Sequence, residues 1–180
     1  NKKYVTYLGW LIKTKGIEEL LTAWEQVHHE YSDWKLRLIG PSSEEYLNDL
    51  KKNYSWEDVI YEGEQNHDIA MKMLSETEIF ILPSYTEGFP NVILEAMALK
   101  KAIIATDVGA IKEMLQEDCG IVIPSKSAQA IAEQLKVLMQ DERLRMQMGN
   151  HAYDRVGKCY DIKEIYLLYR EIWNSNKQYL

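Results

Sequence analysis

The sequence predicts a single α/β domain with a Rossmann-like, three-layer architecture, in which helices cover both faces of a parallel sheet. Two observations support this prediction. Six short apolar runs of the strand type alternate with segments whose apolar residues recur at helical spacing. Across all 180 residues, no internal repeat, low-complexity tract or linker divides the chain. Because strands that alternate with helices form parallel sheets covered on both faces, we expect one such domain over residues 1–180.

The expected strands are the apolar runs at residues 4–8, 35–39, 59–61, 79–82, 102–105 and 121–123. The expected helices span residues 16–29, 43–53, 68–75, 90–99, 127–139, 141–156 and 161–174. The first helix is justified by Ile17, Leu20, Leu21, Trp24 and Val27, which fall on one face of a 3.6-residue period. The last helix repeats this pattern with an aromatic stripe that we assign to packing.

Composition narrows the range of partners. The formal net charge is −7 and the pI is about 5.2, which argues against nucleic acid or an anionic membrane as the partner of this domain. Cys119 and Cys159 lack metal-type spacing, so we expect free thiols and a cytoplasmic location. No signal peptide or membrane-spanning run is visible. Because the chain opens on Asn1 and soon enters a strand, we expect a piece whose preceding part is missing.

Ligands of parallel α/β sheets bind outside the carboxyl ends of the strands. The loops expected at those ends are residues 9–16, 40–43, 61–66, 83–90, 106–110 and 124–127. The most informative run of the chain, from Glu87 to Glu95, begins in one of these loops. We therefore expect the binding site at this edge of the sheet.

Glu87 and Glu95 are two acids that flank a turn and a helix start. Glu87 precedes a helix N-terminus that favours anions, so its carboxylate should face a neutral group rich in hydroxyls. Glu95, further along the helix, can reach a second polyol such as a ribose. Gly88 would allow the backbone to approach a ligand closely. Spacing alone leaves open that Glu95 is an exposed helical glutamate and Glu87 a turn or capping acid.

The helix start between these acids suits a phosphate. Pro90 is expected in the first helical turn, where its missing N–H is not needed. The amides of Phe89, Asn91 and Val92 would then point out of the helix, toward an anion that the helix dipole favours. A diphosphate is the ligand that this arrangement predicts.

Several motifs in order resemble a known family. They are residues 83–98 (PSYTEGFPNVILEAMA), residues 104–109 (IATDVG) and Glu113. They are similar to the donor-binding, C-terminal domain of retaining GT-B glycosyltransferases of family 4 (glycosyl transferases group 1), whose signature is E-x7-E. Gly9 and the later pair Lys15-Gly16 resemble the family's first loop. The resemblance spans nearly the whole chain.

The resemblance implies roles for individual residues. Glu87 would bind hydroxyls of the donor sugar, Glu95 would bind the ribose, and Lys15 would neutralise the leaving nucleoside diphosphate. The loop that begins at Tyr61 would face the base, and the loop that contains Gly9 would line the donor site. Glu87 and Lys15 are therefore the candidate catalytic residues, and the amides near Phe89–Val92 would hold the diphosphate.

The resemblance also implies an activity. A nucleoside-diphosphate sugar, with a UDP-sugar favoured, would donate its sugar to a glycan or a lipid-linked acceptor in bacterial envelope or capsular polysaccharide synthesis. No Asp-x-Asp motif occurs, so neither a metal nor another cofactor is expected. The acceptor site would lie on an N-terminal domain absent from this chain, and this piece alone should be inactive. Membrane contact, if any, would not involve this domain.

One departure from the family pattern concerns charge. The family commonly has an arginine where this chain has Trp10, and an indole cannot replace a guanidinium fork. Trp10 either stacks on a ligand ring or packs under its loop. Lys100, Ala102 and Ala110 replace a common Gly, Pro and Gly. The alternative function is a degenerate, non-catalytic domain for nucleotide-sugar binding or scaffolding. An epimerase or phosphorylase of the same architecture is a third, weaker alternative.

The histidines give weaker signals. His28 and His29 are adjacent on one helical turn, which is poor metal geometry, so we expect both to be solvated. His67 is expected at a helix start near the loop of residues 61–66.

Overall fold

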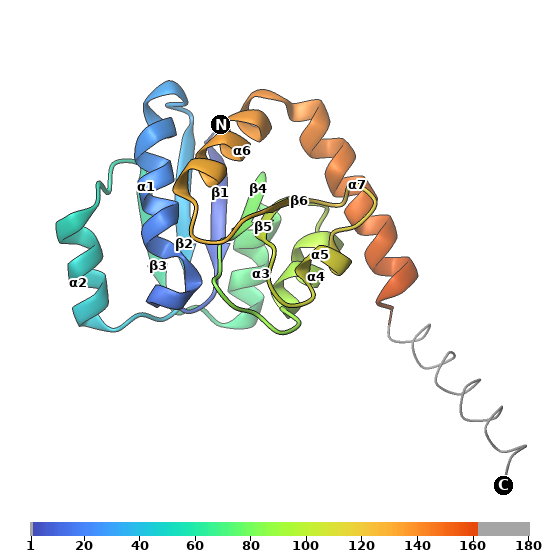
Figure 1. The fold of residues 1–180 in the computed structure, drawn as a ribbon, viewed down its shortest axis with the longest axis horizontal. Coiled ribbons are helices and arrows are strands. Elements are labelled where there is room, and N and C mark those ends of the chain that lie inside the picture. Colours follow the sequence, from blue (N-terminus) through green and yellow to red (C-terminus); the bar gives the residue numbers. More distant parts are fainter. Residues whose placement is uncertain (1, 162–180) are drawn as a thin grey trace, which may run out of the picture.

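The computed structural model describes residues 2–161 and confirms the α/β prediction. Six parallel strands form one sheet in the order β3-β2-β1-β4-β5-β6 (Figure 1). The strands are β1 (Lys3–Leu8), β2 (Trp34–Ile39), β3 (Val59–Gly63), β4 (Ile79–Leu82), β5 (Ala102–Thr106) and β6 (Ile121–Ile123). All six lie where the apolar runs predict them.

The helices form the outer two layers. They are α1 (Ile17–Val27), α2 (Glu44–Asn53), α3 (His67–Ser75), α4 (Asn91–Ala98), α5 (Ile111–Met114), α6 (Ala128–Gln140) and α7 (Glu142–Cys159), with 3₁₀ turns η1 (Lys13–Lys15) and η2 (His28–Glu30). Right-handed crossovers that run in opposite directions from the centre place α1 and α4 on opposite faces of the sheet. α6 packs on α1, and α7 packs on α4 (Figure 1). The helix expected over 161–174 falls, apart from its first residue, outside the described residues.

The burial of the strands explains why their sequences are apolar runs rather than alternating patterns. Every residue of β4 and β5 is buried, because helices cover both faces of the sheet there. All residues of the edge strand β3 are only partly buried, and two of the three in β6 are. The core therefore lies along the centre of the sheet, around the paired strands β1 and β4.

The strand order reverses direction between β1 and β4. From β1 the chain moves outward to β2 and β3, then returns across the sheet to β4 and continues to β6. The loops after β1 and β4 therefore leave the sheet in opposite directions, and a crevice opens between them at the carboxyl edge.

Two close contacts hold these loops together. Gly16 ends η1 with φ +70°, and a Cβ at this position would lie 2.1 Å from the carbonyl oxygen of Pro83. The amide of Tyr85 donates to the carbonyl of Thr14 at 2.8 Å. Only glycine fits both the left-handed backbone and this approach, so Gly16 is required for the two loops to lie this close.

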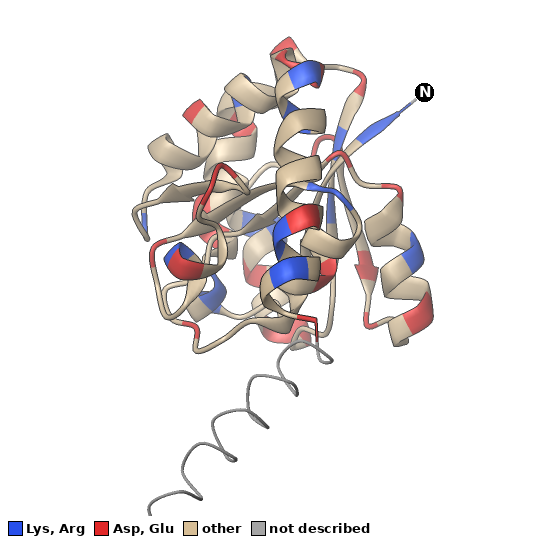
Figure 2. Ribbon diagram, turned by 90° about the vertical axis from the view of Figure 1, so that its right-hand side faces the viewer, with Lys and Arg blue, Asp and Glu red and all other residues tan. Residues whose placement is uncertain are grey.

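Charged residues of both signs are distributed along the helices. Figure 2 shows acidic and basic residues interspersed on the face that it presents. Among the helices of residues 2–161, none has the length and apolar character needed to cross a membrane.

The backbone at the end of α4 packs directly against Gly149 of α7. α4 ends with Lys100 in the left-handed conformation (φ 57°), and the amide of Lys101 donates back to the Ala96 carbonyl at 3.0 Å. This is the Schellman arrangement, with lysine where glycine is usual. Gly149 of α7 rests on this turn, since a Cβ there would lie 2.1 Å from the carbonyl oxygen of Lys100.

We therefore predict that Gly149→Ala lowers the free energy of unfolding by about 1–3 kcal/mol, because the added methyl group overpacks this contact. Gly157→Ala in the same helix is the matched control, since a Cβ there meets no atom within 4 Å. Helix propensity alone should make the control more stable, by up to about 1 kcal/mol. Urea denaturation measures both variants, and equal stability changes would contradict the packing argument.

Candidate functional site

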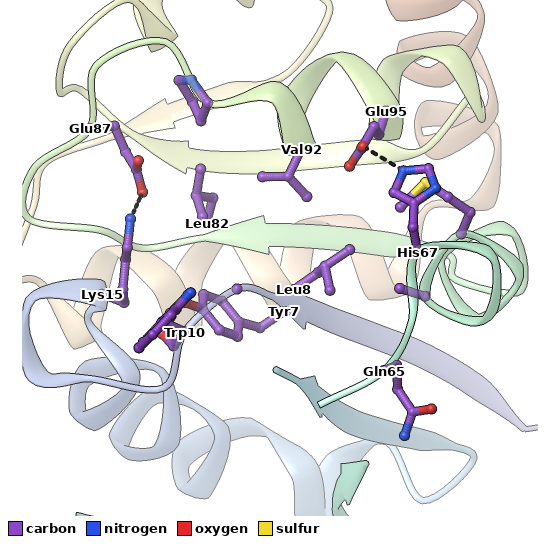
Figure 3. A pocket seen from close by; sticks show the side chains of 14 residues that line it. Tyr7, Leu8, Trp10, Lys15, Gln65, His67, Leu82, Glu87, Val92 and Glu95 are labelled. Carbon is purple, nitrogen blue, oxygen red and sulfur yellow. Dashed lines mark hydrogen bonds and ion pairs between the residues drawn. The ribbon is translucent and has the colours of Figure 1, made fainter. Parts of the chain in front are cut away.

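A cavity of about 450 Å³ occupies the crevice between β1 and β4 (Figure 3). Residues from the ends of β1 and β4, from the loops that follow them and from α3 and α4 line it. Seven of the predicted site residues are among them, namely Gly9, Trp10, Lys15, Glu87, Pro90, Val92 and Glu95. The structure thus brings together residues from two distant loops: Lys15 and Glu87 are in contact although they are 72 positions apart in the sequence.

One end of the cavity carries an ion pair between the two candidate catalytic residues. The Nζ atom of Lys15 donates to Oε1 of Glu87 at 2.5 Å, and the Ser84 hydroxyl donates to the same oxygen at 2.6 Å. Thr106 in turn fixes the backbone of Ser84, since its hydroxyl donates to the Ser84 carbonyl at 2.6 Å. Within the described part of the chain, Oε1 takes both bonds and Oε2 takes none. The carboxylate is therefore oriented and keeps one oxygen for a ligand.

Tyr7 holds the loop after β1 in place at this end of the cavity. Its hydroxyl donates to the backbone carbonyl of Trp10 at 2.7 Å, which fixes the start of the loop after β1. Burial raises the pKa of Tyr7 well above its ordinary value, and the nearby Glu87 carboxylate raises it further. Tyr7 therefore remains a neutral hydrogen-bond donor at any physiological pH.

The other end of the cavity carries a second polar pair. Nε2 of His67 lies 3.1 Å from Oε1 of Glu95. His67 is the first residue of α3, as predicted, and the Asn66 side chain caps this helix by accepting from the Ile69 amide. Figure 3 shows the two polar pairs at opposite ends, with the apolar side chains Leu8, Leu82 and Val92 between them. The cavity thus offers two separate polar ends and an apolar middle.

The helices that follow β1 and β4 lack side-chain caps. Elsewhere in residues 2–161, polar side chains cap α2, α3, α6 and α7, namely Ser43, Asn66, Ser127 and Asp141. α1 and α4 begin instead at Gly16 and Pro90, without a side-chain cap, as does the four-residue α5. The first amides of a helix have no intrahelical acceptor. Those of α4, at Asn91 and Val92, therefore remain available to an anion.

Pro90 lies one position earlier than expected. It is the N-cap residue of α4 (φ −75°, ψ 108°) rather than a residue of the first helical turn, and the Ile93 amide donates to its carbonyl at 3.0 Å. The N-cap carbonyl begins the helical bonding while its own N–H is not needed, so proline is tolerated there as well.

Four other predicted residues do not line the cavity. Tyr61 donates its hydroxyl to the Gly40 carbonyl at 3.0 Å, and its pKa is raised by burial. Phe89 is half-exposed, with its ring 5.8 Å from that of Tyr160, and Asn91 is exposed. A Cβ at Gly88 would meet nothing within 4 Å. Two backbone segments approach closely at Gly109 (φ +57°), where a Cβ would lie 2.3 Å from the Glu87 carbonyl oxygen.

Trp10 lies at the mouth of the cavity with 65% of its surface exposed. The packing role considered for it belongs to the next residue, Leu11, which is fully buried. Packing under the loop is therefore not the arrangement of Trp10, and its indole face is open to a ligand or to another domain.

The expectation that His28 and His29 are both solvated is wrong for His28. α1 ends at Val27, and the following 3₁₀ turn places His28 against Trp24, where only 2% of its surface is exposed. His29 is exposed. A helical pattern extended to residue 29 could not show this change of backbone geometry.

Sequence reasoning missed the residues that orient the predicted ones. Tyr7 reads as a core position in a strand. Ser84 lies three positions before Glu87, a local S-x-x-E spacing, whereas Thr106 has no such relation to it. Gln65 lines the cavity beside His67. The one usable signal for all four was their place at the carboxyl ends of strands or in the loops that follow.

Comparisons with known proteins identify the family of this chain. The family model of Glycosyl transferases group 1 matches residues 1–155. The capsular polysaccharide biosynthesis glycosyltransferase CapM of Staphylococcus aureus is 28% identical over 179 residues, which cover 95% of this chain and 46% of that protein. The chain therefore spans about half the length of the curated relatives that it matches.

Two solved structures show the same fold. The C-terminal domain of the glycosyl transferase group 1 family protein LpcC from Francisella tularensis is 30% identical, with a TM-score of 0.77 over 89% of this chain and 87% of that domain. Anabaena Alr3699/HepE, in complex with UDP, is 20% identical, with a TM-score of 0.86 over 97% of this chain and 49% of that one. With a family match over most of its length and a GT-B C-terminal domain fold, the chain belongs to the glycosyl transferases group 1 family.

Proposed function

We propose that this chain is the donor-binding domain of a retaining glycosyltransferase that uses a nucleoside-diphosphate sugar. The observation that carries the proposal is the juxtaposition of the Lys15–Glu87 pair with the uncapped start of α4 in one cavity. This arrangement offers a cation and free amides for a diphosphate next to a carboxylate for sugar hydroxyls. The E-x7-E signature of the family fits the same assignment.

The diphosphate would bind between the amides of Asn91 and Val92 and the ammonium group of Lys15. Lys15 is held by Glu87 when no ligand is bound, so the diphosphate would have to draw it away. Both charges are largely shielded from water, with 25% and 12% of their side chains exposed. Such shielding strengthens the attraction between Lys15 and the charge that develops on the leaving group. We propose that this attraction serves in place of a bound divalent cation or other cofactor.

The two polar ends of the cavity would separate the sugar from the nucleoside. Glu87 keeps Oε2 for hydroxyls of the sugar, while Glu95, held by His67, would accept from the ribose. The apolar middle, with Leu8, Leu82 and Val92, would lie beneath the intervening part of the donor. Because the structure of HepE contains UDP, a UDP-sugar is the favoured donor.

The acceptor would bind elsewhere in the enzyme. Since the relatives are about twice as long as this chain, we propose that an N-terminal domain supplies the acceptor site and that this chain alone transfers no sugar. CapM and another relative, a putative teichuronic acid biosynthesis glycosyltransferase of Bacillus subtilis, support a role in bacterial surface polysaccharide synthesis. We propose that this chain acts on the cytoplasmic side of the membrane.

One observation favours a second candidate, a degenerate domain that binds nucleotide sugars or other proteins without catalysis. Trp10 provides no charge at a position where the family commonly has arginine, and Lys15 is the single cation that lines the cavity in the described part of the chain, apart from any charge on His67. The change in nucleotide affinity when arginine is restored at position 10 tests whether this departure has weakened the site.

We predict that the chain binds UDP and that Lys15→Ala weakens this binding about 10- to 100-fold, the usual worth of a hydrogen bond to a charged group. Isothermal titration with UDP, GDP and ADP measures the affinities. Lys13→Ala removes a charge from the same turn without touching the cavity and should bind as the wild type does. No binding of any of the three nucleotides at millimolar concentration would overturn the proposed function.

Glu87→Ala should distinguish the contribution of the sugar to binding from that of the diphosphate. Without its partner carboxylate Lys15 is free, so we expect UDP to bind as well as before or better. The affinity for the UDP-sugar should fall about tenfold, because the carboxylate that accepts hydrogen bonds from its hydroxyls is gone. The same titration, with UDP-glucose, UDP-galactose and UDP-N-acetylglucosamine, gives the ratio of the two affinities. An equal loss for UDP and for the best UDP-sugar would remove the assigned role of Glu87.

Trp10→Arg tests whether the absence of the family's usual arginine weakens the diphosphate site. A guanidinium at the cavity mouth should raise the affinity for UDP about tenfold, because it adds a charge-assisted contact to the diphosphate. Trp10→Ala is the control for simple removal of the indole. If both substitutions raise the affinity equally, relief of steric blockage rather than charge explains the effect.

A further inference from the structure

A cluster of metal-ligating side chains lies at the opposite edge of the sheet from the crevice. His28, His29 and Glu57 each offer one ligand atom, and these three atoms lie within 4.8 Å of one another. His28 and His29 precede β2, and Glu57 precedes β3. Because β2 and β3 are parallel neighbours, the segments that enter them meet at the amino edge. The cluster therefore has no contact with the donor site.

Local contacts preorganise this cluster. The ring of His28 stacks on that of Trp24, with 6.2 Å between centroids and 17° between planes. The indole N–H of Trp24 donates to the backbone carbonyl of Glu57 at 3.2 Å. A single buried tryptophan thus fixes both the histidine and the segment that carries the glutamate. His29 lies beside His28, with 3.7 Å between the ring centroids.

A second carboxylate lies near the buried histidine. Oδ2 of Asp58 lies 3.9 Å from Nδ1 of His28, while Oδ1 of Asp58 pairs with Lys35. Histidines that bind metals commonly hydrogen-bond a carboxylate through their other ring nitrogen. At 3.9 Å the Asp58 carboxylate is too far from His28 for that bond and acts on the ring through its charge, which Lys35 partly neutralises.

We propose that His28, His29 and Glu57 form a binding site for a divalent transition metal ion of the Zn²⁺ type. Two imidazoles and one carboxylate suit Zn²⁺ better than Mg²⁺ or Ca²⁺, which prefer sites made of oxygen atoms. Ligand atoms about 2.0–2.2 Å from a tetrahedral zinc are about 3.4 Å apart. His29 and Glu57 are exposed, so their side chains are free to rotate and close the remaining distance onto the fixed His28.

The bound ion would have a structural role. It would tie the end of α1 to the segment before β3, and so pin the entrances of two neighbouring strands. Three protein ligands leave a fourth position to water. Because the site lies at the amino edge, metal binding should stabilise the fold without changing the affinity of the crevice for nucleotides. The proposal is independent of the donor-binding function.

The test is titration of the untagged, EDTA-treated chain with Zn²⁺ by calorimetry, and we expect one equivalent to bind. His29→Ala and Glu57→Gln should each weaken binding at least about tenfold, since even residues behind the ligands change metal affinity by that factor. Both side chains are exposed, so the variants should fold. His151→Ala removes another histidine that lies near acidic groups and should bind Zn²⁺ as the wild type does.

Thermal melting provides the second readout. Zn²⁺ should raise the Tm of the wild type and of His151→Ala, because a ligand that binds only the native state stabilises it. It should not raise the Tm of His29→Ala, and Mg²⁺ should have no effect on any of them. Absence of binding at millimolar Zn²⁺, or binding that survives His29→Ala, would overturn the proposal. Loss of binding in His67→Ala instead would place the metal at the crevice and would also overturn it.

Discussion

The close contact between the loops after β1 and β4 is the constraint on which the rest of this site depends. Gly16 lies against the Pro83 carbonyl and Thr14 accepts from the Tyr85 amide, so neither loop can shift without the other. The loop after β1 contributes Lys15, and the loop after β4 contributes Glu87. Gly109 has a similar role: it allows the loop after β5 to lie close to the backbone of Glu87. Two glycines with left-handed backbones therefore set the distance between an ammonium group and a carboxylate.

The sequence predicted the fold well because the relevant signals are periodic. Six apolar runs gave all six strands, since central strands covered on both faces must be apolar at every position. The four-residue helix α5 was missed, because such a short segment shows no period. The burial of His28 was missed because it depends on where α1 changes to a 3₁₀ turn, a backbone choice that the side-chain pattern does not record.

The candidate site was predictable only in part, for a related reason. Glu87 and Glu95 stand at a recognisable spacing, and both line the cavity. Lys15 and His67, the partners of these acids, come from other elements, and only the packed chain brings them into contact. Uncapped helix starts at Gly16 and Pro90 carry meaning only when compared with the capped starts elsewhere. The place of the acids at the cavity could thus be predicted from sequence, whereas their orientation could not.

Under the proposed function, the ion pair between Lys15 and Glu87 would affect selectivity. In the free chain the two charges neutralise each other, so a ligand that engages only one would leave the other without its counter-ion in a shielded site. A bare diphosphate would draw Lys15 away and leave Glu87 charged beside a polyanion. A free sugar would engage Glu87 but offer nothing to Lys15. A donor that carries a sugar on its diphosphate would satisfy both at once, and burial makes an unpaired charge costly. The pair would thus favour the intact donor over its two parts, which suits an enzyme that must bind its donor and release its product.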